Sequence, residues 1–270
     1  MSIYDTAYLK GLAERFGFTF EKSFGQNFLT DTAAVERIVE ASGALGADVF
    51  EIGPGAGALT LGLSRVARSV RVLELDRRLE PVLKETLPPS VELTWGDILT
   101  FPLDSLPKSD RRVAVSNLPY NVTTKALTRL FESGMFSRIT VTVQKEYARK
   151  LVQKENRSLI ALLAEHYAEP KYLFTIPAGS FYPRPGVDSA VVTMALKPLD
   201  PDKESEAMFI RTAHALYASR RKTVRNTLSA EFGASAADAA LKSAEVDPAA
   251  RGEDLSAREV ERISSALMLK

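Results

Sequence analysis

The chain has 270 residues, of which 45% are hydrophobic and 26% charged, a balance that excludes disordered and collagen-like proteins. It contains no cysteine and only the histidines His166 and His214, so we expect no disulfide, no thiolate chemistry and no metal site. The net charge is +1 and no apolar run approaches the roughly 18 residues of a membrane span, so we expect a soluble, cytoplasmic protein without a membrane partner.

The near-zero net charge conceals an uneven distribution of basic residues. Residues 121–157 hold eight Lys or Arg against three Asp or Glu, and residues 211–226 hold five basic residues and no acid. Local basic patches of this kind can bind phosphate even when the total charge is neutral. Solvated helix faces are the alternative explanation for any single patch.

The central part of the chain alternates short β-branched runs with helical patterns, which is typical of a parallel sheet with crossover helices. Before the first run, Val35, Ile38 and Val39 predict a helix with Thr30 or Asp31 as its N-cap. We expect the last two strands to close the sheet as a hairpin-like pair around residues 181–189. The predicted strands are 49–52, 70–75, 91–95, 113–116, 139–143, 172–176 and 190–196.

The composition changes at residues 197–201, where two prolines and flanking charges indicate a linker. Beyond it the β-branched runs end, and the sequence predicts a small all-helical domain. We therefore expect a catalytic domain over residues 1–198 and a helical domain over residues 199–270. The predicted helices of the second domain are 205–218, 220–231, 235–245 and 256–268.

A glycine-rich turn, Glu51–Gly57, follows the first predicted strand and precedes a helix that extends to about Val66. Glycines at this point let the backbone turn sharply and approach a ligand closely. The Gly53, Gly55, Gly57 spacing, with an acid two positions before the first glycine, differs from the dinucleotide fingerprint and disfavours NAD. A tight structural turn is the alternative explanation for the glycines alone.

Two further acids end the next strands. Glu74 follows Gly53 by 21 residues, where its carboxylate can accept hydrogen bonds from both hydroxyls of a ribose. Asp97 follows the third strand, where it can read an adenine amino group. Because ligands of open α/β sheets bind at the carboxyl ends of the strands, these features predict one nucleoside site.

The fourth strand ends in Asn117-Leu118-Pro119-Tyr120, which suits methylation of an amine on an aromatic ring. The Asn117 side-chain oxygen and the Leu118 carbonyl can accept the two N6 hydrogens of an adenine, which directs the nitrogen lone pair toward a methyl donor. Pro119 fixes the local φ angle, and Tyr120 can stack on the base. Taken alone, the tetrapeptide could also be a simple strand-to-helix turn.

The glycine-rich turn and the two acids resemble class I S-adenosylmethionine-dependent methyltransferases. Over most of its length the chain resembles the small-subunit ribosomal RNA adenine N6-dimethyltransferase family. This resemblance implies a Rossmann-like, mostly parallel seven-stranded sheet with a C-terminal helical domain. The motifs that carry the resemblance are residues 22–29, 51–57, 74–76, 117–120, 181–189 and 220–223.

The resemblance implies S-adenosylmethionine as cofactor and small-subunit rRNA in a pre-ribosomal particle as partner. The expected reaction adds two methyl groups to N6 of each of two adjacent adenosines near the 3′ end of that rRNA, and we expect a monomer. By resemblance the cofactor contacts are Asn27, Leu29, Gly53, Gly55, Glu74, Asp97 and Asn117, with Phe181 covering the target base opposite Tyr120.

We also expect a basic cluster on one helix of the second domain to bind RNA, formed by Arg220, Arg221, Lys222 and Arg225. Two other functions stay open. One is methylation of a large-subunit rRNA adenine, which shares the tetrapeptide chemistry. The other is a non-catalytic RNA-binding assembly factor that retains the fold.

Overall fold

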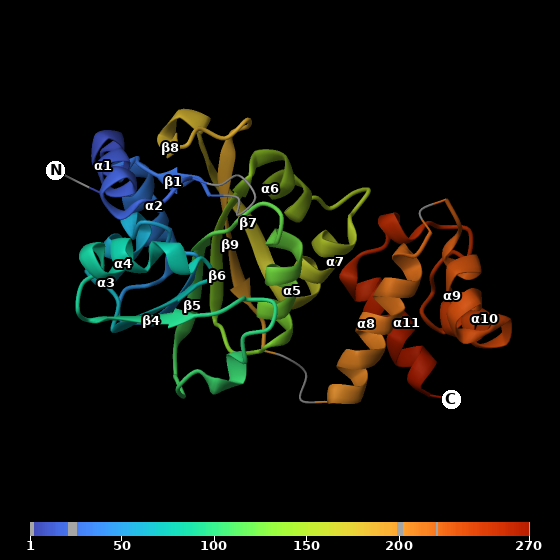
Figure 1. The fold of residues 1–270 in the computed structure, drawn as a ribbon. Helices are drawn as coiled ribbons and strands as arrows, with labels where there is room; N and C mark the ends of the chain where they lie inside the picture. The colour runs from blue at the N-terminus through green and yellow to red at the C-terminus, as the bar shows by residue number, and fades with distance from the viewer. Residues whose placement is uncertain (1–2, 21–25, 199–201, 220, 270) are drawn as a thin grey trace. The chain divides into compact units, whose positions relative to one another are not determined.

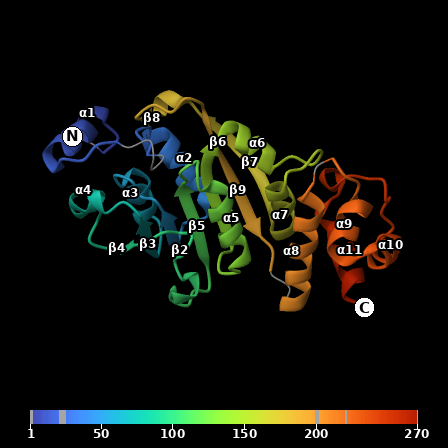
Figure 2. The same ribbon diagram turned by 45° about the vertical axis from the view of Figure 1, so that its right-hand side comes forward.

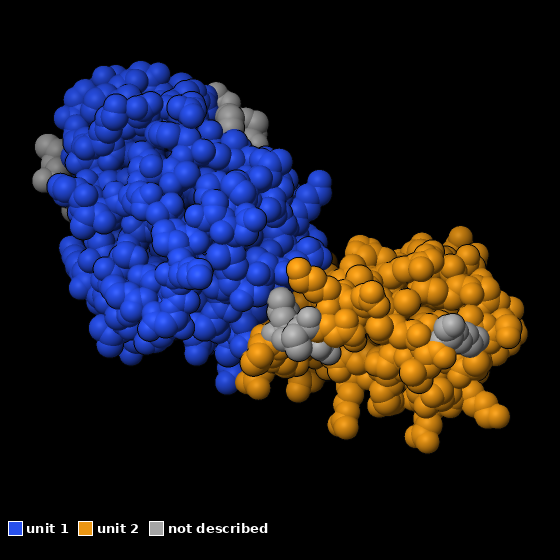
Figure 3. Space-filling model, turned by 90° about the horizontal axis from the view of Figure 1, so that it is seen from below, with its two compact units in different colours: residues 1–148, 170–196 blue, residues 149–169, 197–270 orange. Residues whose placement is uncertain are grey.

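The computed structural model describes residues 3–20, 26–198, 202–219 and 221–269, and the chain divides into two compact units (Figures 1 and 3). We call residues 1–148 and 170–196 the sheet unit, and residues 149–169 and 197–270 the helical unit. The passage from Leu196 to Lys197 lies next to the boundary proposed from the prolines. The helical unit also takes in residues 149–169, which no composition change sets apart.

A seven-stranded sheet with the order β4-β3-β2-β5-β6-β9-β7 forms the sheet unit (Figures 1 and 2). Strands β2 to β6 pair in parallel, and β9 is antiparallel to β6. The mostly parallel sheet is thus confirmed, with β9 and β7 as neighbours at one edge. The strands are β2 Asp48–Ile52, β3 Ser69–Glu74, β4 Val91–Trp95, β5 Arg112–Asn117, β6 Arg138–Gln144, β7 Ala168–Ile176 and β9 Ser189–Leu196.

The central strands are largely buried because helices cover them, and their sequences are accordingly rich in apolar and β-branched residues, including the buried Thr140 and Thr142 of β6. On one face, Val35 and Ile38 of α2 are each 1% exposed and join a core that includes Val72 and Val115. Asp31 caps α2 by accepting a hydrogen bond from the Ala34 N–H at 3.1 Å, as expected. The helices that precede or connect the strands up to β6, or follow it, are α1 Thr6–Phe16, α2 Thr32–Ser42, α3 Ala58–Ser64, α4 Glu80–Thr86, α5 Thr123–Glu132 and α6 Lys145–Leu151.

A second sheet of two short strands was not predicted from the sequence. Strand β1, Phe28–Leu29, pairs antiparallel with β8, Phe181–Tyr182. The pairing continues beyond the strands, because the Thr30 N–H donates to the Ser180 carbonyl at 2.9 Å and the Ser180 hydroxyl donates to Asp31 Oδ2 at 2.8 Å. The N-terminal segment is therefore tied to the loop that precedes β9.

The helical unit contains five α-helices within the described residues, and one start differs from the prediction. A helix was expected from residue 220, but α9 begins at Val224, because the Thr223 hydroxyl accepts a hydrogen bond from the Asn226 N–H and so acts as N-cap. Arg221 and Lys222 therefore lie in the preceding turn. The helices are α7 Leu159–Tyr167, α8 Lys203–Tyr217, α9 Val224–Phe232, α10 Ala234–Ser243 and α11 Ala257–Met268.

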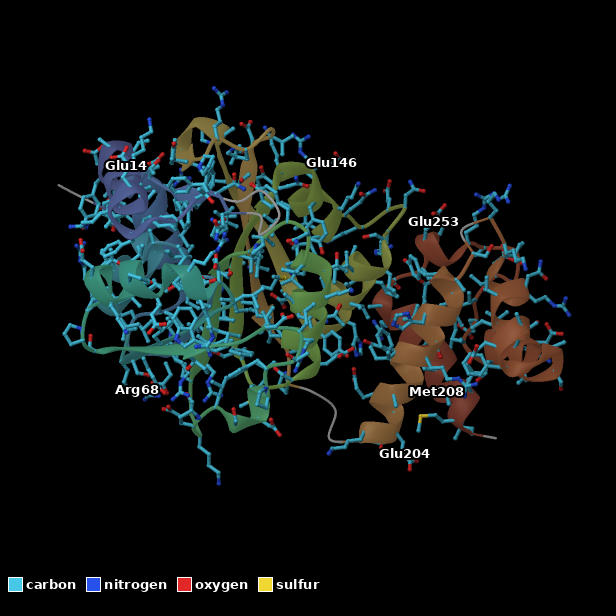
Figure 4. All side chains as sticks on the ribbon, in the orientation of Figure 1. Glu14, Arg68, Glu146, Glu204, Met208 and Glu253 are labelled. Atoms are coloured by element: carbon cyan, nitrogen blue, oxygen red, sulfur yellow. The ribbon has the colours of Figure 1, made fainter. Side chains whose placement is uncertain are left out.

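Helix α7 joins the helical unit through a histidine between two other helices. The His166 ring lies 2.6 Å from Glu261 of α11 and 3.3 Å from Glu206 of α8, and it stacks on Phe209 with ring centroids 3.6 Å apart. The Arg157 N–H also donates to the carbonyl of Glu253, a residue labelled in Figure 4. These contacts explain why residues 149–169 belong with the C-terminal helices.

The turn before α11 imposes a steric requirement at Gly252. A Cβ added there would lie 2.7 Å from the Leu216 carbonyl oxygen, a backbone atom that cannot rotate away. We expect Gly252→Ala to destabilise the full chain by about 1–3 kcal/mol, the usual cost of overpacking. Denaturant unfolding followed by circular dichroism measures this. Gly186→Ala is the matched control, because a Cβ there meets nothing within 4 Å, and equal stability of the two variants would contradict the prediction.

Candidate active site

A cavity of about 260 Å³ lies at the carboxyl ends of the parallel strands. Arg68, which precedes β3, and Glu146, which follows β6, lie at opposite ends of the sheet, and the cavity belongs to the end that Glu146 marks (Figure 4). It is lined by residues at the ends of four parallel strands, β2, β3, β4 and β5, and by residues of the N-terminal part of the chain. Those singled out by the sequence are Asn27, Leu29, Gly53, Gly55, Glu74, Asp97, Asn117 and Pro119.

The glycine-rich turn forms one wall of the cavity, and two of its glycines are required for different reasons. Gly53 and Gly55 both have positive φ angles, 67° and 59°, which residues other than glycine rarely adopt. A Cβ on Gly55 would lie 2.6 Å from the Phe28 ring, so this position allows β1 to approach the turn. A Cβ on Gly53 would meet no atom within 4 Å, so Gly53 keeps the space beside the cavity free for a ligand.

The cavity is acidic. Among the described residues that line it are Glu51, Glu74, Asp76 and Asp97, and none of those lining residues is Lys, Arg or His. Within the part of the chain that the structure describes, Asp76 alone among these four acids is paired with a cationic side chain, Arg78 at 2.7 Å. A pyrophosphate would find no cationic side chain on these walls, whereas a cationic ligand would find several carboxylates. The electrostatics therefore agree with the glycine spacing in disfavouring a dinucleotide.

Glu51 is the most deeply buried of these acids. Glu51 lies on β2 and is 1% exposed, and its Oε2 has no hydrogen-bond partner among the described residues. Burial, with a smaller contribution from the negative charge of Glu74, raises the pKa of Glu51 to about 8. The sequence analysis noted this acid beside the glycines without giving it a role.

Glu74 and Asp97 are held by backbone N–H groups at the ends of their strands. Glu74 Oε1 accepts hydrogen bonds from the N–H groups of Leu75 and Asp76 at 2.9 and 2.8 Å, while burial raises the pKa of Glu74 to about 7. Asp97 Oδ1 accepts the Leu99 N–H at 2.9 Å. Both side chains line the cavity with their orientation fixed locally, as a ligand-binding acid requires.

Asn117 ends β5 and is oriented from a distant part of the chain. Its Nδ2 donates to the Asn27 carbonyl at 2.9 Å. Because the amide nitrogen is engaged, Oδ1 is the atom left to accept hydrogen bonds at the cavity. Pro119 then starts the turn into α5, with its carbonyl accepting hydrogen bonds from the Val122 N–H and the Thr123 hydroxyl.

Three other residues singled out from the sequence do not line the cavity. Leu118 is 1% exposed, and its N–H donates to the Thr142 carbonyl. Tyr120 is partly buried, and its hydroxyl lies 2.8 Å from the Ser189 hydroxyl. Phe181 is 3% exposed and packs in the hydrophobic core, so its ring does not face the cavity in this structure.

Several residues of the cavity wall were not predicted from the sequence to belong to the site, among them Gln26, Asp76, Ile98 and Asn121. Gln26 Nε2 donates to Asp76 Oδ2 at 2.7 Å, which joins the segment before β1 to the end of β3. Asp76 stands two residues after Glu74, so the sequence showed two acids close together at the end of β3. This proximity could have indicated that Asp76 also faces the cavity. Nothing in the sequence marks Ile98 or Asn121 beyond their nearness to Asp97 and Tyr120.

The basic cluster expected to bind RNA does not lie on one helix. Arg220 lies outside the described residues, while Arg221 and Lys222 are in the turn before α9, where Arg221 is exposed. Arg225 is on α9, but two of its nitrogens donate to Asp238 of α10 at 2.6 and 2.8 Å. A phosphate at Arg225 would have to compete with this carboxylate, so Arg221 and Lys222 are the better placed pair.

The raised pKa of Glu51 predicts how the free energy of unfolding depends on pH. Between its ordinary value of 4.5 and its folded value of about 8, the folded chain holds a proton that the unfolded chain has lost, so the free energy of unfolding falls as pH rises. We expect Glu51→Gln to match wild type below pH 4.5 and to make the ligand-free protein more stable than wild type above pH 8, by up to about 5 kcal/mol, since each pH unit between the two pKa values contributes about 1.4 kcal/mol.

Urea unfolding over a pH series measures this difference. Glu36→Gln removes an exposed carboxylate of α2 and serves as the control, with no expected change across the series. A stability difference between wild type and Glu51→Gln that does not depend on pH would show that the Glu51 carboxyl is not protonated in the folded protein.

Two further observations bear on the nature of the site. Within the described part of the chain, no helix is both long and apolar enough to cross a membrane. No cluster of three or more metal-binding side chains is found among those same residues.

Comparison with known proteins gives one consistent result. The chain is 39% identical to the ribosomal RNA small subunit methyltransferase A of Shouchella clausii, covering 97% of this chain and 94% of the relative, and 38% identical to that of Streptococcus thermophilus, covering 99% and 98%.

Solved structures share the fold. The crystal structure of a dimethyladenosine transferase from Plasmodium falciparum matches with a TM-score of 0.73 at 19% identity, covering 87% of this chain and 95% of that one. The 23S rRNA methyltransferase ErmE matches with a TM-score of 0.68 at 24% identity, covering 90% and 100%. The family model for ribosomal RNA adenine dimethylase matches residues 17–268. The chain therefore belongs to the ribosomal RNA adenine dimethylase family.

Proposed function

We propose that the chain transfers methyl groups from S-adenosylmethionine to N6 of two adjacent adenosines near the 3′ end of small-subunit (16S) rRNA. The products are N6,N6-dimethyladenosines. Relatives at 38–39% identity over nearly the whole chain are named as small-subunit rRNA methyltransferases, which favours this substrate over a large-subunit adenine. The observation that carries the proposal is an acidic cavity, with no basic residue among its described lining residues, beside an oriented Asn117.

The residues of the cavity fit S-adenosylmethionine. When bound there, the cofactor supplies a methyl group activated by a positively charged sulfur. Its sulfonium and ammonium cations suit cavity walls that carry carboxylates and, among the described lining residues, no Lys, Arg or His. Glu74 is placed to accept hydrogen bonds from the ribose hydroxyls, and Asp97 to accept one from the adenine amino group. Gly53 leaves room for the methionyl part.

Asn117 orients the target amine. An adenine N6 is a poor nucleophile because its lone pair is delocalised into the ring. Asn117 Oδ1 and the Leu118 carbonyl accept its two hydrogens, which favours a pyramidal nitrogen with its lone pair directed at the methyl group. Methyl transfer would form a bond from N6 to the methyl carbon as the methyl–sulfur bond breaks and its electron pair stays on sulfur. The nitrogen then becomes acidic and loses a proton to water, so no strong general base is needed.

Two aromatic residues were proposed to enclose the target base, and they differ in their exposure. Tyr120 keeps a partly exposed ring, held in place by the Ser189 hydroxyl, and is the stacking partner that we favour. Phe181 belongs to β8 and packs in the core, so it would reach a base only if the β1–β8 pair rearranged.

The helical unit contributes the RNA contact in this proposal. Arg221 and Lys222 are neighbouring cations that can neutralise phosphates of a pre-ribosomal particle. A monomer acting in the cytoplasm is sufficient for this function, because the sheet unit itself supplies every cavity residue named above.

The mechanism predicts the effect of removing the Asn117 amide. We expect Asn117→Ala to slow methyl transfer by about 10²-fold or more, as when one oriented group of an active site is removed. Because Asn117 also faces the cofactor cavity, the rate is measured in a single turnover at saturating cofactor and saturating under-methylated small subunits. Asn226→Ala, at an exposed asparagine of α9, is the control. A near-normal single-turnover rate would show that the amine is oriented by another group.

The RNA contact predicts a specific salt dependence. Replacing both Arg221 and Lys222 with glutamine should weaken binding to the small subunit and reduce the slope of log K against log salt by about 0.7–0.9 for each phosphate that is no longer neutralised. Arg225→Gln should have a smaller effect, because Asp238 already neutralises that residue. Lys242→Gln, an exposed lysine of α10, is the control. An unchanged slope in the double variant would mean that this turn does not contact RNA.

A further inference from the structure

We propose that Arg184 binds a backbone phosphate of the rRNA next to the target adenosine. Arg184 belongs to residues 183–188, which connect β8 to β9 and which we call the target loop. The inference rests on the proposed function, because an RNA adenosine is taken as the substrate. It gives the sheet unit an RNA contact of its own, separate from the contact proposed for Arg221 and Lys222 in the helical unit.

The reaction itself requires that the RNA backbone be held close to the site. An adenine N6 can reach Asn117, at the end of β5, only if its nucleotide is turned out of the RNA stack. The phosphates on either side of that nucleotide then lie at the rim of the site. Because phosphate contacts fix the position of a nucleic acid on its protein, a cation near Tyr120 would hold the nucleotide in place.

Hydrogen bonds fix the target loop beside Tyr120. Directly after the loop, the Ser189 hydroxyl lies 2.8 Å from the Tyr120 hydroxyl. The last residue of the loop is Asp188, whose carbonyl accepts the Lys145 N–H at 3.0 Å. Figures 1 and 2 accordingly show the chain between β8 and β9 beside the start of α6. This end of the loop is therefore joined to the residue proposed to stack on the base.

The other end of the target loop is joined to the cofactor cavity. It follows Tyr182, which pairs with Phe28 of the cavity wall. Within the loop, Arg184 stands between Pro183 and Pro185. Each proline ring fixes its own φ angle and restricts the residue before it to extended backbone. Arg184 is thus presented between the two halves of the site by a segment with few accessible backbone conformations.

The Arg184 side chain is available for a ligand. It is exposed and makes no hydrogen bond, ion pair or ring contact with any residue in the described part of the chain. Other exposed arginines of the sheet unit are engaged by carboxylates, such as Arg15 by Glu85 and Arg68 by Asp48. A guanidinium presents its N–H donors as a planar fork that matches two oxygens of a phosphate. A phosphate at Arg184 would therefore compete with no carboxylate of the described residues.

The charges around the target loop differ in sign from those of the cofactor cavity. Lys145 lies 3.6 Å from Asp188, so these two charges largely cancel. Lys125 of α5 is exposed and has no ion pair with a described residue, while Glu146 of α6 adds a negative charge. Together with Arg184 these segments hold three cations against two acids, whereas acids alone charge the described cavity wall. A polyanion is therefore favoured at the target loop rather than at the cofactor cavity.

An apolar side chain on the same loop favours RNA over a small anion. Val187 is 49% exposed, which is unusual for a large hydrophobic residue of this chain. It can pack against a ribose or the face of a base while Arg184 holds a phosphate. RNA offers both kinds of group within one nucleotide, and an inorganic anion offers only the charge.

Binding to under-methylated small subunits over a salt series tests the charge. We expect Arg184→Gln to weaken binding about tenfold at low salt, and to reduce the slope of log K against log salt by about 0.7–0.9, the value for one phosphate. Arg184→Lys should keep the slope, because it keeps the charge. The matched control is Arg65→Gln, since Arg65 is exposed and lies between α3 and β3, at the opposite end of the sheet. An unchanged slope in Arg184→Gln would overturn the proposal.

A probe on the same loop tests the location. Because the chain contains no cysteine, Val187→Cys introduces a single thiol, to which an iron–EDTA group that cleaves nearby RNA can be attached. We expect cleavage of the nucleotides that flank the methylated adenosines, and none there when the probe is attached to Arg65→Cys. Cleavage confined to other regions of the rRNA, or the same pattern from both positions, would overturn the proposal.

Measurements on the wild-type chain separate this inference from the proposed function. If the two small-subunit adenosines are methylated and Arg184→Gln retains the wild-type salt slope, the contact at the target loop alone is overturned. If the wild-type chain methylates neither adenosine, the proposed function and this inference are both overturned. Arg184→Gln should bind S-adenosylmethionine with unchanged affinity, because Arg184 does not line the cavity, and circular dichroism establishes that the variant is folded.

Discussion

The site depends on one constraint, the parallel pairing of β2 with β3 and with β5. This register brings the ends of three strands to a single edge, and each of them ends at or close to a polar residue: Glu51, Glu74 and Asn117. Burying carboxylates there is unfavourable, and the apolar interiors of the same strands offset that cost through the core around Val72 and Val115. The core therefore stabilises an edge that would be unstable by itself.

The charge of this edge also selects what it can bind. Enzymes that hold phosphate groups at the same position of a doubly wound sheet use glycine N–H groups and a helix N-terminus to attract negative charge. Here the glycine turn is kept, but the acids reverse the local sign of the field. Fold class alone would not distinguish the two cases, so the proposal of a cationic cofactor rests on the side chains.

The features that sequence could predict are those encoded by neighbouring residues. Short runs rich in β-branched and other apolar residues are sufficient to find β2 through β6, and polar residues at the strand ends are sufficient to predict that Glu74, Asp97 and Asn117 would meet. Pairings between distant segments leave no such signal. Strands of two residues, such as β1 and β8, have no periodicity to detect, and their pairing decides that Phe181 is buried. The orientation of the Asn117 amide depends on the Asn27 carbonyl, 90 residues away in sequence, for the same reason.

The antiparallel pair β1–β8 has a consequence for the order of events at the site. β1 borders the cofactor cavity through Phe28 and Leu29, while β8 belongs to the loop that leads to Ser189, the partner of Tyr120. One ladder thus joins a wall of the proposed cofactor cavity to the segment that holds Tyr120, the residue proposed to stack on the base. To the extent that either ligand restrains this ladder, the two binding equilibria are coupled, and by reciprocity each ligand raises the affinity of the other by the same factor.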